Sequence, residues 1–256
     1  MKVSISKIRQ FKACRRAYFF KYIECLTPVK KADALEIGSN YHSLIEWLYD
    51  HGTLDGVEED NSKELAMATA YWKYIYPQVK VKSAEEWFEY QLKSGDTLIG
   101  RVDGIAEDGM LVEHKTTSSE IGPQYEYNLM WDEQILAYML AKDVRKMYYT
   151  VCRKPTIRQK QNESEEDFFH RMIEWYDTDT DSKIALLEVE RTDEEVKAFE
   201  EQLCKVIEDM RFSQTEGSCY PNCLWCNVWG RRCEYSSICL NYDKNETYIE
   251  FTKEES

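Results

Sequence analysis

Apolar residues follow a helical period at the start of the chain and a strand period in its middle. Ser4 caps a first predicted helix over residues 7–23, and further helices are predicted over 39–52 and 64–77. Between residues 86 and 117 the period changes to two, which predicts three strands, over 86–92, 97–107 and 110–116. Short polar turns, "KSGD" and "EDG", separate these strands.

Helices and strands alternate in the remainder of the chain. The pattern predicts a helix over 131–144, a strand over 146–152, a helix over 165–176 and a strand over 183–190. Thr192 and Glu195 have the spacing of a capping box for a long helix that ends near Arg211. The sequence therefore predicts one α/β domain over residues 1–217, followed by a cysteine-rich lobe with an acidic tail over residues 218–256.

The third predicted strand carries charge on its apolar face. A period of two puts Glu113 and Lys115 on the same face as Leu111. A three-residue loop, Glu107-Asp108-Gly109 with a left-handed Gly109, would place Asp103 directly opposite Glu113. A two-residue Asp-Gly loop would instead place Asp103 opposite His114, and we favour the three-residue loop because it gathers the charged groups.

Two carboxylates at this separation repel each other unless a cation lies between them. Mg²⁺ or Mn²⁺ suits such a pair, since Mg²⁺ takes one or two protein carboxylates and fills its remaining positions with water and phosphate oxygens. The adjacent lysine can orient the attacking water and stabilise charge on a phosphate. The alternative interpretation is an ordinary cross-strand salt bridge.

These residues stand in a longer series of polar positions. Their order is a helical histidine after a glycine, a strand aspartate, a Glu-x-Lys motif and a Gln-x-x-x-Tyr pair on one helix face. The series resembles the RecB-like branch of the PD-(D/E)XK nuclease superfamily, and it is carried by Gly38, His42, Asp103, Glu113, Lys115, Gln134 and Tyr138.

The resemblance implies a fold, a site and an activity. The fold is a restriction-endonuclease-like core, a central mixed sheet flanked by helices. The implied metal ligands are His42, Asp103, Glu113 and the backbone carbonyl of His114, and Lys115 assists the attacking water. Gln134 and Tyr138 hold the DNA or the geometry of the site.

Charge is distributed unevenly along the chain. The formal net charge is −14, yet residues 1–31 carry nine basic side chains against one acid, Glu24. Such a segment can bind a polyanion or can be a solvated basic helix. No apolar run approaches the length of a membrane span, and the N-terminal segment lacks the apolar core of a signal peptide. We therefore expect a cytoplasmic protein of a bacterium, or a phage protein in the host cytoplasm.

Five of the nine cysteines lie between Cys219 and Cys239, which favours metal ligation over disulfides. Cys223 and Cys226 have the spacing of half a zinc ribbon, with Cys219 nearby. Alternatively, Cys226, Cys233 and Cys239 bind a metal together with a distant fourth ligand. The remaining cysteines, Cys25, Cys152 and Cys204, are interpreted as core thiols.

The second choice resembles AddB-type subunits and CRISPR adaptation nucleases, in which one N-terminal and three C-terminal cysteines hold a cluster. That resemblance implies a [4Fe–4S] cluster on Cys14, Cys226, Cys233 and Cys239, with zinc as the alternative metal. The short first spacing of the family is absent here, so Cys223 could replace Cys226. The cluster would join the C-terminal lobe to the N-terminal helix.

The expected function is a metal-dependent DNA nuclease, an exonuclease acting on DNA ends or single strands in recombination, repair or replication. The alternatives are a site-specific endonuclease of the same superfamily and a non-catalytic DNA-binding or assembly subunit. The expected partner is DNA, with recombination or helicase proteins as further candidates.

Overall fold

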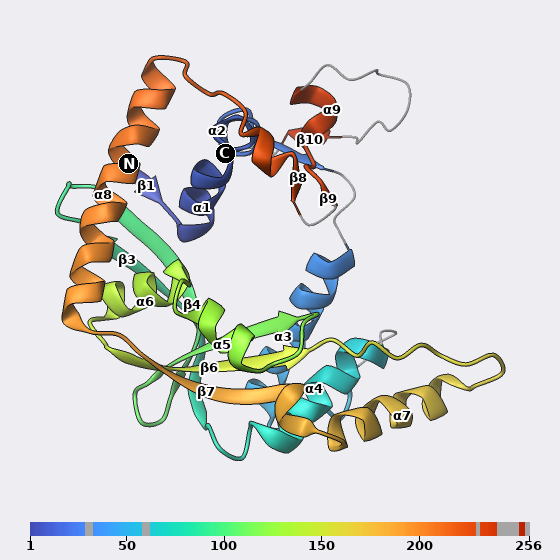
Figure 1. The fold of residues 1–256 in the computed structure, drawn as a ribbon. Helices are drawn as coiled ribbons and strands as arrows, with labels where there is room; N and C mark the ends of the chain where they lie inside the picture. Colours follow the sequence, from blue (N-terminus) through green and yellow to red (C-terminus); the bar gives the residue numbers. More distant parts are fainter. Residues whose placement is uncertain (29–32, 58–61, 229–230, 240–250, 254–256) are drawn as a thin grey trace. The chain divides into compact units, whose positions relative to one another are not determined.

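The computed structural model describes residues 1–28, 33–57, 62–228, 231–239 and 251–253 (Figure 1). The chain forms two compact units, each built from separated segments. The first comprises Met1–Ala32, Glu89–Gly100 and Lys197–Ser256, and the second Asp33–Phe88 and Arg101–Val196. The division at residues 217 and 218 stays a prediction, and residues 254–256 of the acidic tail lie outside the described residues. None of the described helices is both long and apolar enough to cross a membrane.

The second unit contains a mixed sheet with helices around it, as the α/β prediction requires. Its helices are α3 (Asp33–His51), α4 (Ser62–Tyr74), α5 (Pro123–Leu129), α6 (Glu133–Lys142) and α7 (Glu165–Asp177). Its strands are β5 (Leu111–Thr117), β6 (Lys146–Arg153) and β7 (Ile184–Glu190), together with most of β3 (Val81–Gln91) and β4 (Thr97–Ala106). A short 3₁₀ helix, η2 (Thr180–Ser182), precedes β7.

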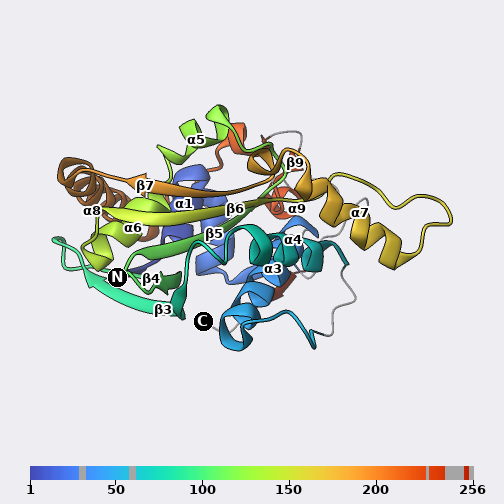
Figure 2. The same cartoon turned by 90° about the horizontal axis from the view of Figure 1, so that it is seen from below.

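Strand β5 lies at the centre of this sheet. It pairs antiparallel with β4 and parallel with β6, and β6 pairs antiparallel with β7 (Figure 2). Strand β3 pairs with β4. The sheet buries apolar side chains against α3 and α4, where Tyr41, Leu48 and Tyr71 are fully buried. Helix α6 lies on the opposite face, because its Tyr138 side chain reaches the backbone of β4 and the ring of Phe88.

The first unit combines the N-terminal helices with the last part of the chain. It contains β1 (Lys2–Val3), α1 (Ile5–Ala13), α2 (Arg15–Tyr18), a π-helical turn η1 (Phe19–Ile23) and β2 (Leu26–Pro28). Its C-terminal elements are α8 (Asp193–Thr215), which starts in the second unit, η3 (Cys223–Trp225), β8 (Asn227–Val228), β9 (Arg231–Arg232), α9 (Ser236–Cys239) and β10 (Phe251–Lys253). Strand β1 pairs with the first residues of β4, and β2 pairs with β10.

The single helix predicted over residues 7–23 is wrong. Cys14 has an extended backbone (φ −161°, ψ 112°) and separates α1 from α2. The carbonyl of Ala13 accepts a hydrogen bond from Asn222 Nδ2 at 2.8 Å, and the backbone N–H of Asn222 donates to Cys14 Sγ at 3.3 Å. Contacts with a distant segment therefore compensate the interrupted helix, which local propensity cannot anticipate.

The predicted caps are confirmed, but several boundaries change: α3 begins at Asp33, so Gly38 lies within this helix and does not precede it. Ser4 Oγ accepts from the backbone N–H of Lys7, and Thr192 and Glu195 form the reciprocal bonds of a capping box. Strand β3 starts earlier than predicted and contains Glu85 at φ +51°, a left-handed residue that interrupts the regular strand. Helix α5 was not predicted, although Pro123 at its first position is a recognised start signal.

Candidate active site

The β4–β5 hairpin brings the two predicted carboxylates together. Gly104 pairs with Val112 and Ile105 with Leu111, and the backbone N–H of Ala106 donates to the carbonyl of Met110 at 2.8 Å. Gly109 has φ +87°, the left-handed conformation that favours glycine. The three-residue loop is therefore confirmed, and continuing the register places Asp103 opposite Glu113.

Beyond the paired residues, a hydrogen bond to a side-chain carboxylate replaces a backbone hydrogen bond of the hairpin. The backbone N–H of His114 donates to Asp103 Oδ2 at 2.8 Å. In a regular ladder this N–H would bond to a carbonyl of β4. The two strands thus separate where their acidic side chains begin, and Asp103 is held by the backbone of β5.

Glu113 is buried, and only one of its two carboxyl oxygens has a hydrogen-bond partner among the described residues. The residue is 1% exposed, and its Oε1 accepts a hydrogen bond from Lys115 Nζ. Its Oε2 has no hydrogen-bond partner among the described residues. A buried carboxyl oxygen without a partner is unfavourable when the group is ionised, and a bound cation would satisfy the ionised form.

Helix α6 positions Lys115 through the predicted Gln-x-x-x-Tyr pair. Asp132 caps this helix by accepting from the backbone N–H of Gln134. Gln134 Oε1 accepts from Lys115 Nζ at 3.0 Å, and Gln134 Nε2 donates to the Tyr138 hydroxyl at 2.5 Å. Tyr138 in turn donates to the carbonyl of Arg101 at 2.8 Å. The pair therefore anchors the lysine to the backbone of β4.

His42 reaches the same carboxylates from α3. Its Nδ1 lies 3.7 Å from Asp103 Oδ2, and both residues line a small hollow together with Glu46 and His114. Burial lowers the pKa of His42, although the charge of Asp103 opposes this. The imidazole is therefore neutral near pH 7, the form in which histidine binds metals.

No role was predicted for the side chain of His114, which anchors the rear of the site to neighbouring elements. It points to the opposite face of β5 from Glu113, is 2% exposed, and contacts Tyr49 Oη at 2.8 Å and Thr150 Oγ1 at 2.6 Å. Tyr49 Oη is also 2.5 Å from Tyr71 Oη. Burial lowers the pKa of His114 to about 3, so the ring is neutral. Helices α3 and α4 are thereby tied to the residue that holds Asp103.

The pKa values of the two carboxyl groups shift in opposite directions. Burial and, after it, the charge of Asp103 raise the pKa of Glu113 to about 8, although Lys115 opposes them. Burial also acts to raise the pKa of Asp103, but His42, His114 and Lys115 outweigh it and the net direction is downward. Without metal, the site near neutral pH therefore holds a protonated Glu113 beside an ionised Asp103.

These residues suit a hard divalent cation. The unpartnered Glu113 oxygen, the Asp103 carboxylate and a neutral imidazole are the donor types that such ions accept. As the described side chains stand, no group of three or more His, Cys, Asp or Glu is close enough to enclose a metal ion. Binding would therefore draw His42 toward the carboxylates.

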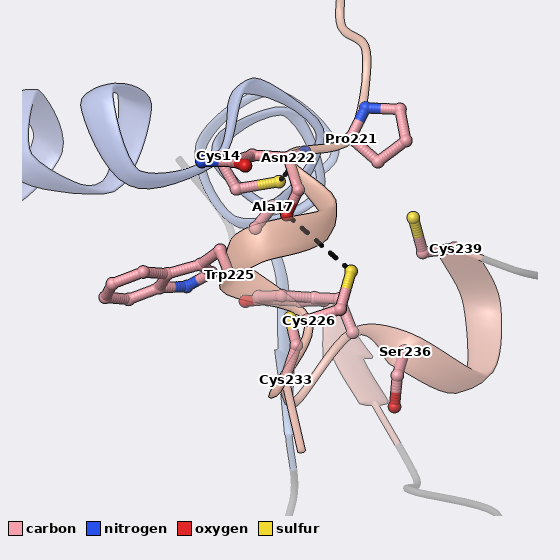
Figure 3. A pocket seen from close by; sticks show the side chains of 10 residues that line it. Cys14, Ala17, Pro221, Asn222, Trp225, Cys226, Cys233, Ser236 and Cys239 are labelled. Atoms are coloured by element: carbon pink, nitrogen blue, oxygen red, sulfur yellow. Dashed lines mark hydrogen bonds between the residues drawn. The ribbon is translucent and has the colours of Figure 1, made fainter. Parts of the chain in front are cut away.

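Four cysteines from the two ends of the chain meet in the first unit. Cys14, Cys226, Cys233 and Cys239 line one small hollow beside Trp225 and Asn222 (Figure 3). Burial raises the pKa of Cys226, Cys233 and Cys239, and the neighbouring sulfurs add to the rise. As the described side chains stand, these thiols are not close enough together to enclose a metal ion, so binding would require them to move.

The other cysteines lie outside this hollow. Cys223 is exposed, and Cys219 is buried beside the carbonyl of Ser213, 3.8 Å away. Cys152 is fully buried, as predicted for a core thiol, while Cys25 and Cys204 are partly exposed. The arrangement therefore places Cys226, rather than Cys223, with Cys14.

Part of the basic N-terminal segment is engaged in folding contacts. Arg15 donates to Ser213 Oγ at 3.0 Å and stacks on the rings of Phe11 and Tyr220. Arg9 and Lys12 are exposed on α1. Lys30 and Lys31 lie outside the described residues. The contribution of this segment to binding a polyanion stays a prediction.

Comparison with known proteins identifies the class. The profile of the PD-(D/E)XK nuclease superfamily matches residues 2–94 and 61–240, so the chain belongs to this superfamily. Its nucleases typically use Mg²⁺ or Mn²⁺. A comparison with curated protein sequences found no match.

Three solved structures are similar to this chain, and the first of them supports the same fold. A protein from Eubacterium rectale, described as a candidate exonuclease, has a TM-score of 0.57 at 13% identity over 96% of this chain and 90% of its own. A phage-related exonuclease from Haemophilus somnus has a TM-score of 0.42 at 15% identity, covering 86% and 97%. An alkaline exonuclease from Laribacter hongkongensis has a TM-score of 0.37 at 12% identity, covering 85% and 93%.

Proposed function

We propose that this protein is a divalent-metal-dependent deoxyribonuclease that acts as an exonuclease on DNA ends or single strands. The observation that carries the proposal is the unpartnered Oε2 of buried Glu113, held between Asp103 and Lys115. A structural salt bridge would not need a second carboxylate at this position, because Asp103 raises the cost of ionising Glu113. The exonuclease activity is proposed from the proteins to which the chain is similar.

Each residue of the site has a defined task. Asp103, Glu113 and His42 would hold the metal, which supplies an activated water and charge for the phosphate oxygens. The carbonyl of His114 would be a fourth ligand, since a residue in a strand directs its N–H and C=O to the same side and this N–H meets Asp103. Lys115 would orient the attacking water, and Gln134 and Tyr138 keep its ammonium in place.

We further propose that Cys14, Cys226, Cys233 and Cys239 hold a [4Fe–4S] cluster. Support comes from the resemblance in cysteine spacing and from the meeting of these four thiols in one hollow. Zinc is the competing metal, because four thiolates suit either. Elemental analysis of anaerobically purified protein should find about four irons per chain, and one zinc without iron would replace the cluster by a zinc site.

The experiment that tests the nuclease is degradation of end-labelled linear DNA and of circular DNA, each single- and double-stranded, with Mg²⁺, Mn²⁺ or EDTA. Asp103→Asn and Lys115→Ala should each lose at least about 100-fold in rate, the usual range for groups that stabilise transition-state charge. Lys142→Ala is the matched control, because Lys142 pairs with Glu86 in the same unit but outside the site.

The outcomes separate the alternatives. Cleavage of circular DNA would indicate an endonuclease, and DNA binding without cleavage in any metal would indicate a non-catalytic subunit. Activity in EDTA, or full activity of both site variants, would refute the metal mechanism.

A further inference from the structure

Strand β7 is an edge strand with an open side. It pairs with β6 through Ile184 to Glu190, and β7 is the last strand in the order of the sheet (Figure 2). An edge strand presents unpaired backbone groups to any chain that can lie beside it.

Alternation along β7 identifies the outward groups. The backbone N–H of Arg153 donates to the carbonyl of Lys183, so Lys183, Ala185 and Leu187 direct their backbone groups toward β6. Ile184, Leu186 and Glu188 therefore direct theirs away from it. None of these outward groups has a hydrogen-bond partner among the described residues.

Among the described residues, the chain itself pairs with this edge at a single position. Ile121 donates its backbone N–H to the carbonyl of Ser182 at 3.0 Å, which lies on the outward side by the same alternation. Gly122 then caps α5 and Pro123 begins it, and proline has no N–H to continue a ladder. The edge from Ile184 onward is thus left open.

A hollow of about 570 Å³ follows this open edge. Its walls come from the end of α4, from the start of α5 and from both faces of β7, and Ile75, Ile121 and Leu186 supply apolar contacts. Three carboxylates, Glu126, Asp179 and Asp181, line it, and no lysine, arginine or histidine is among the lining residues that the structure describes. Glu188 is exposed just beyond it.

We propose that this hollow binds an extended, basic segment of a partner protein, which adds to the sheet as a strand beside β7. Backbone bonds to Leu186 and Glu188 would supply affinity, and lysine or arginine side chains would meet the three carboxylates. A second copy of this chain fits poorly, because it would bring its own carboxylates and a formal net charge of −14 to the same edge. The proposal is independent of the nuclease activity.

A labelled synthetic peptide that alternates lysine and valine tests the proposal by fluorescence anisotropy. The matched variants are Leu186→Pro and Leu186→Ala. Both shorten the side chain, but only proline removes the outward N–H, which has no partner in the free protein. Leu186→Pro should weaken binding about tenfold or more relative to Leu186→Ala, the loss expected for one or two backbone hydrogen bonds.

Charge-neutralising variants and amide hydrogen exchange test the same proposal without requiring the proline variant to fold. Asp181→Asn with Glu126→Gln should weaken the lysine peptide, and a glutamate–valine peptide should not bind. In the parent, the peptide should slow exchange of the Leu186 and Glu188 amides in NMR spectra, whereas the Leu187 amide faces β6 and should not change.

Three results would overturn the proposal. The first is absence of binding at millimolar peptide, and the second is binding that slows no outward amide. The third is a concentration-dependent dimer that Leu186→Pro abolishes, which would show self-pairing of β7 instead.

Discussion

Replacing Glu113 by glutamine should remove a pH dependence of stability that the metal-free protein carries. The folded protein retains the proton of Glu113 up to about pH 8, whereas an ordinary glutamate releases it near 4.5. The folded state therefore binds more protons than the unfolded chain between these values. Its stabilisation is complete below about pH 4.5 and is lost as the pH rises through 8.

The structure gives the size of the effect. Integrating the proton difference for a pKa of about 8 in the folded state gives a fall of about 2.6 kcal/mol in unfolding free energy between pH 6 and pH 9. Glutamine has nearly the same shape and can still accept a hydrogen bond from Lys115, but it does not titrate. The curve of the Glu113→Gln variant should therefore be flatter than that of the parent by about this amount.

Urea unfolding in EDTA, followed by tryptophan fluorescence from pH 6 to pH 9, measures both curves. Thiols and other groups titrate equally in the two proteins, so the difference isolates Glu113. Mn²⁺ should oppose the loss in the parent, because it favours the ionised carboxylate, and should have little effect on Glu113→Gln. Parallel curves for the two proteins would refute the buried, unsatisfied carboxyl on which the site depends.

The other predictions concern the supports of the site and the first unit. Tyr138→Phe removes the hydroxyl between Gln134 and the Arg101 carbonyl and should cost about 1–3 kcal/mol in urea unfolding, with a reduced rate but unchanged metal dependence; an unaltered rate would show that it does not position Lys115. Cys14→Ser should lose the bound metal in elemental analysis, and Cys223→Ser should retain it; the reverse result would show that the wrong cysteines were chosen. Charge reversal of Arg9 and Lys12 together should weaken DNA binding and reduce its salt dependence, and identical salt titrations would place the DNA elsewhere.

Local patterns predicted the β4–β5 hairpin. The Glu107-Asp108-Gly109 loop determines the register, and the register alone places Asp103 opposite Glu113. The Gln134–Tyr138 pair and the capping boxes are equally local. Such features depend on residues within a few positions of one another, so a single sequence contains them.

Features that depend on distant segments were not predictable. The interruption at Cys14 is compensated by Asn222, more than two hundred residues away. The structural role of the His114 ring depends on Tyr49 and Tyr71 from two helices and on Thr150 from the next strand. An alternating strand pattern shows that His114 faces away from Glu113, but not what it meets there.

The interleaving of the two units determines an order of folding during synthesis. Every residue of the second unit, including those of the candidate active site, has left the ribosome once Val196 emerges, whereas the first unit must wait for its cysteines up to Cys239. The N-terminal helices are thus synthesised first, but the unit to which they belong is completed last. The apolar face of α1 stays uncovered until then. Non-local pairing of this kind slows folding and prolongs exposure to aggregation. A ribosome stalled when Val196 has just left the exit tunnel should therefore carry a second unit that is already protected from protease and an N-terminal segment that is still cleaved.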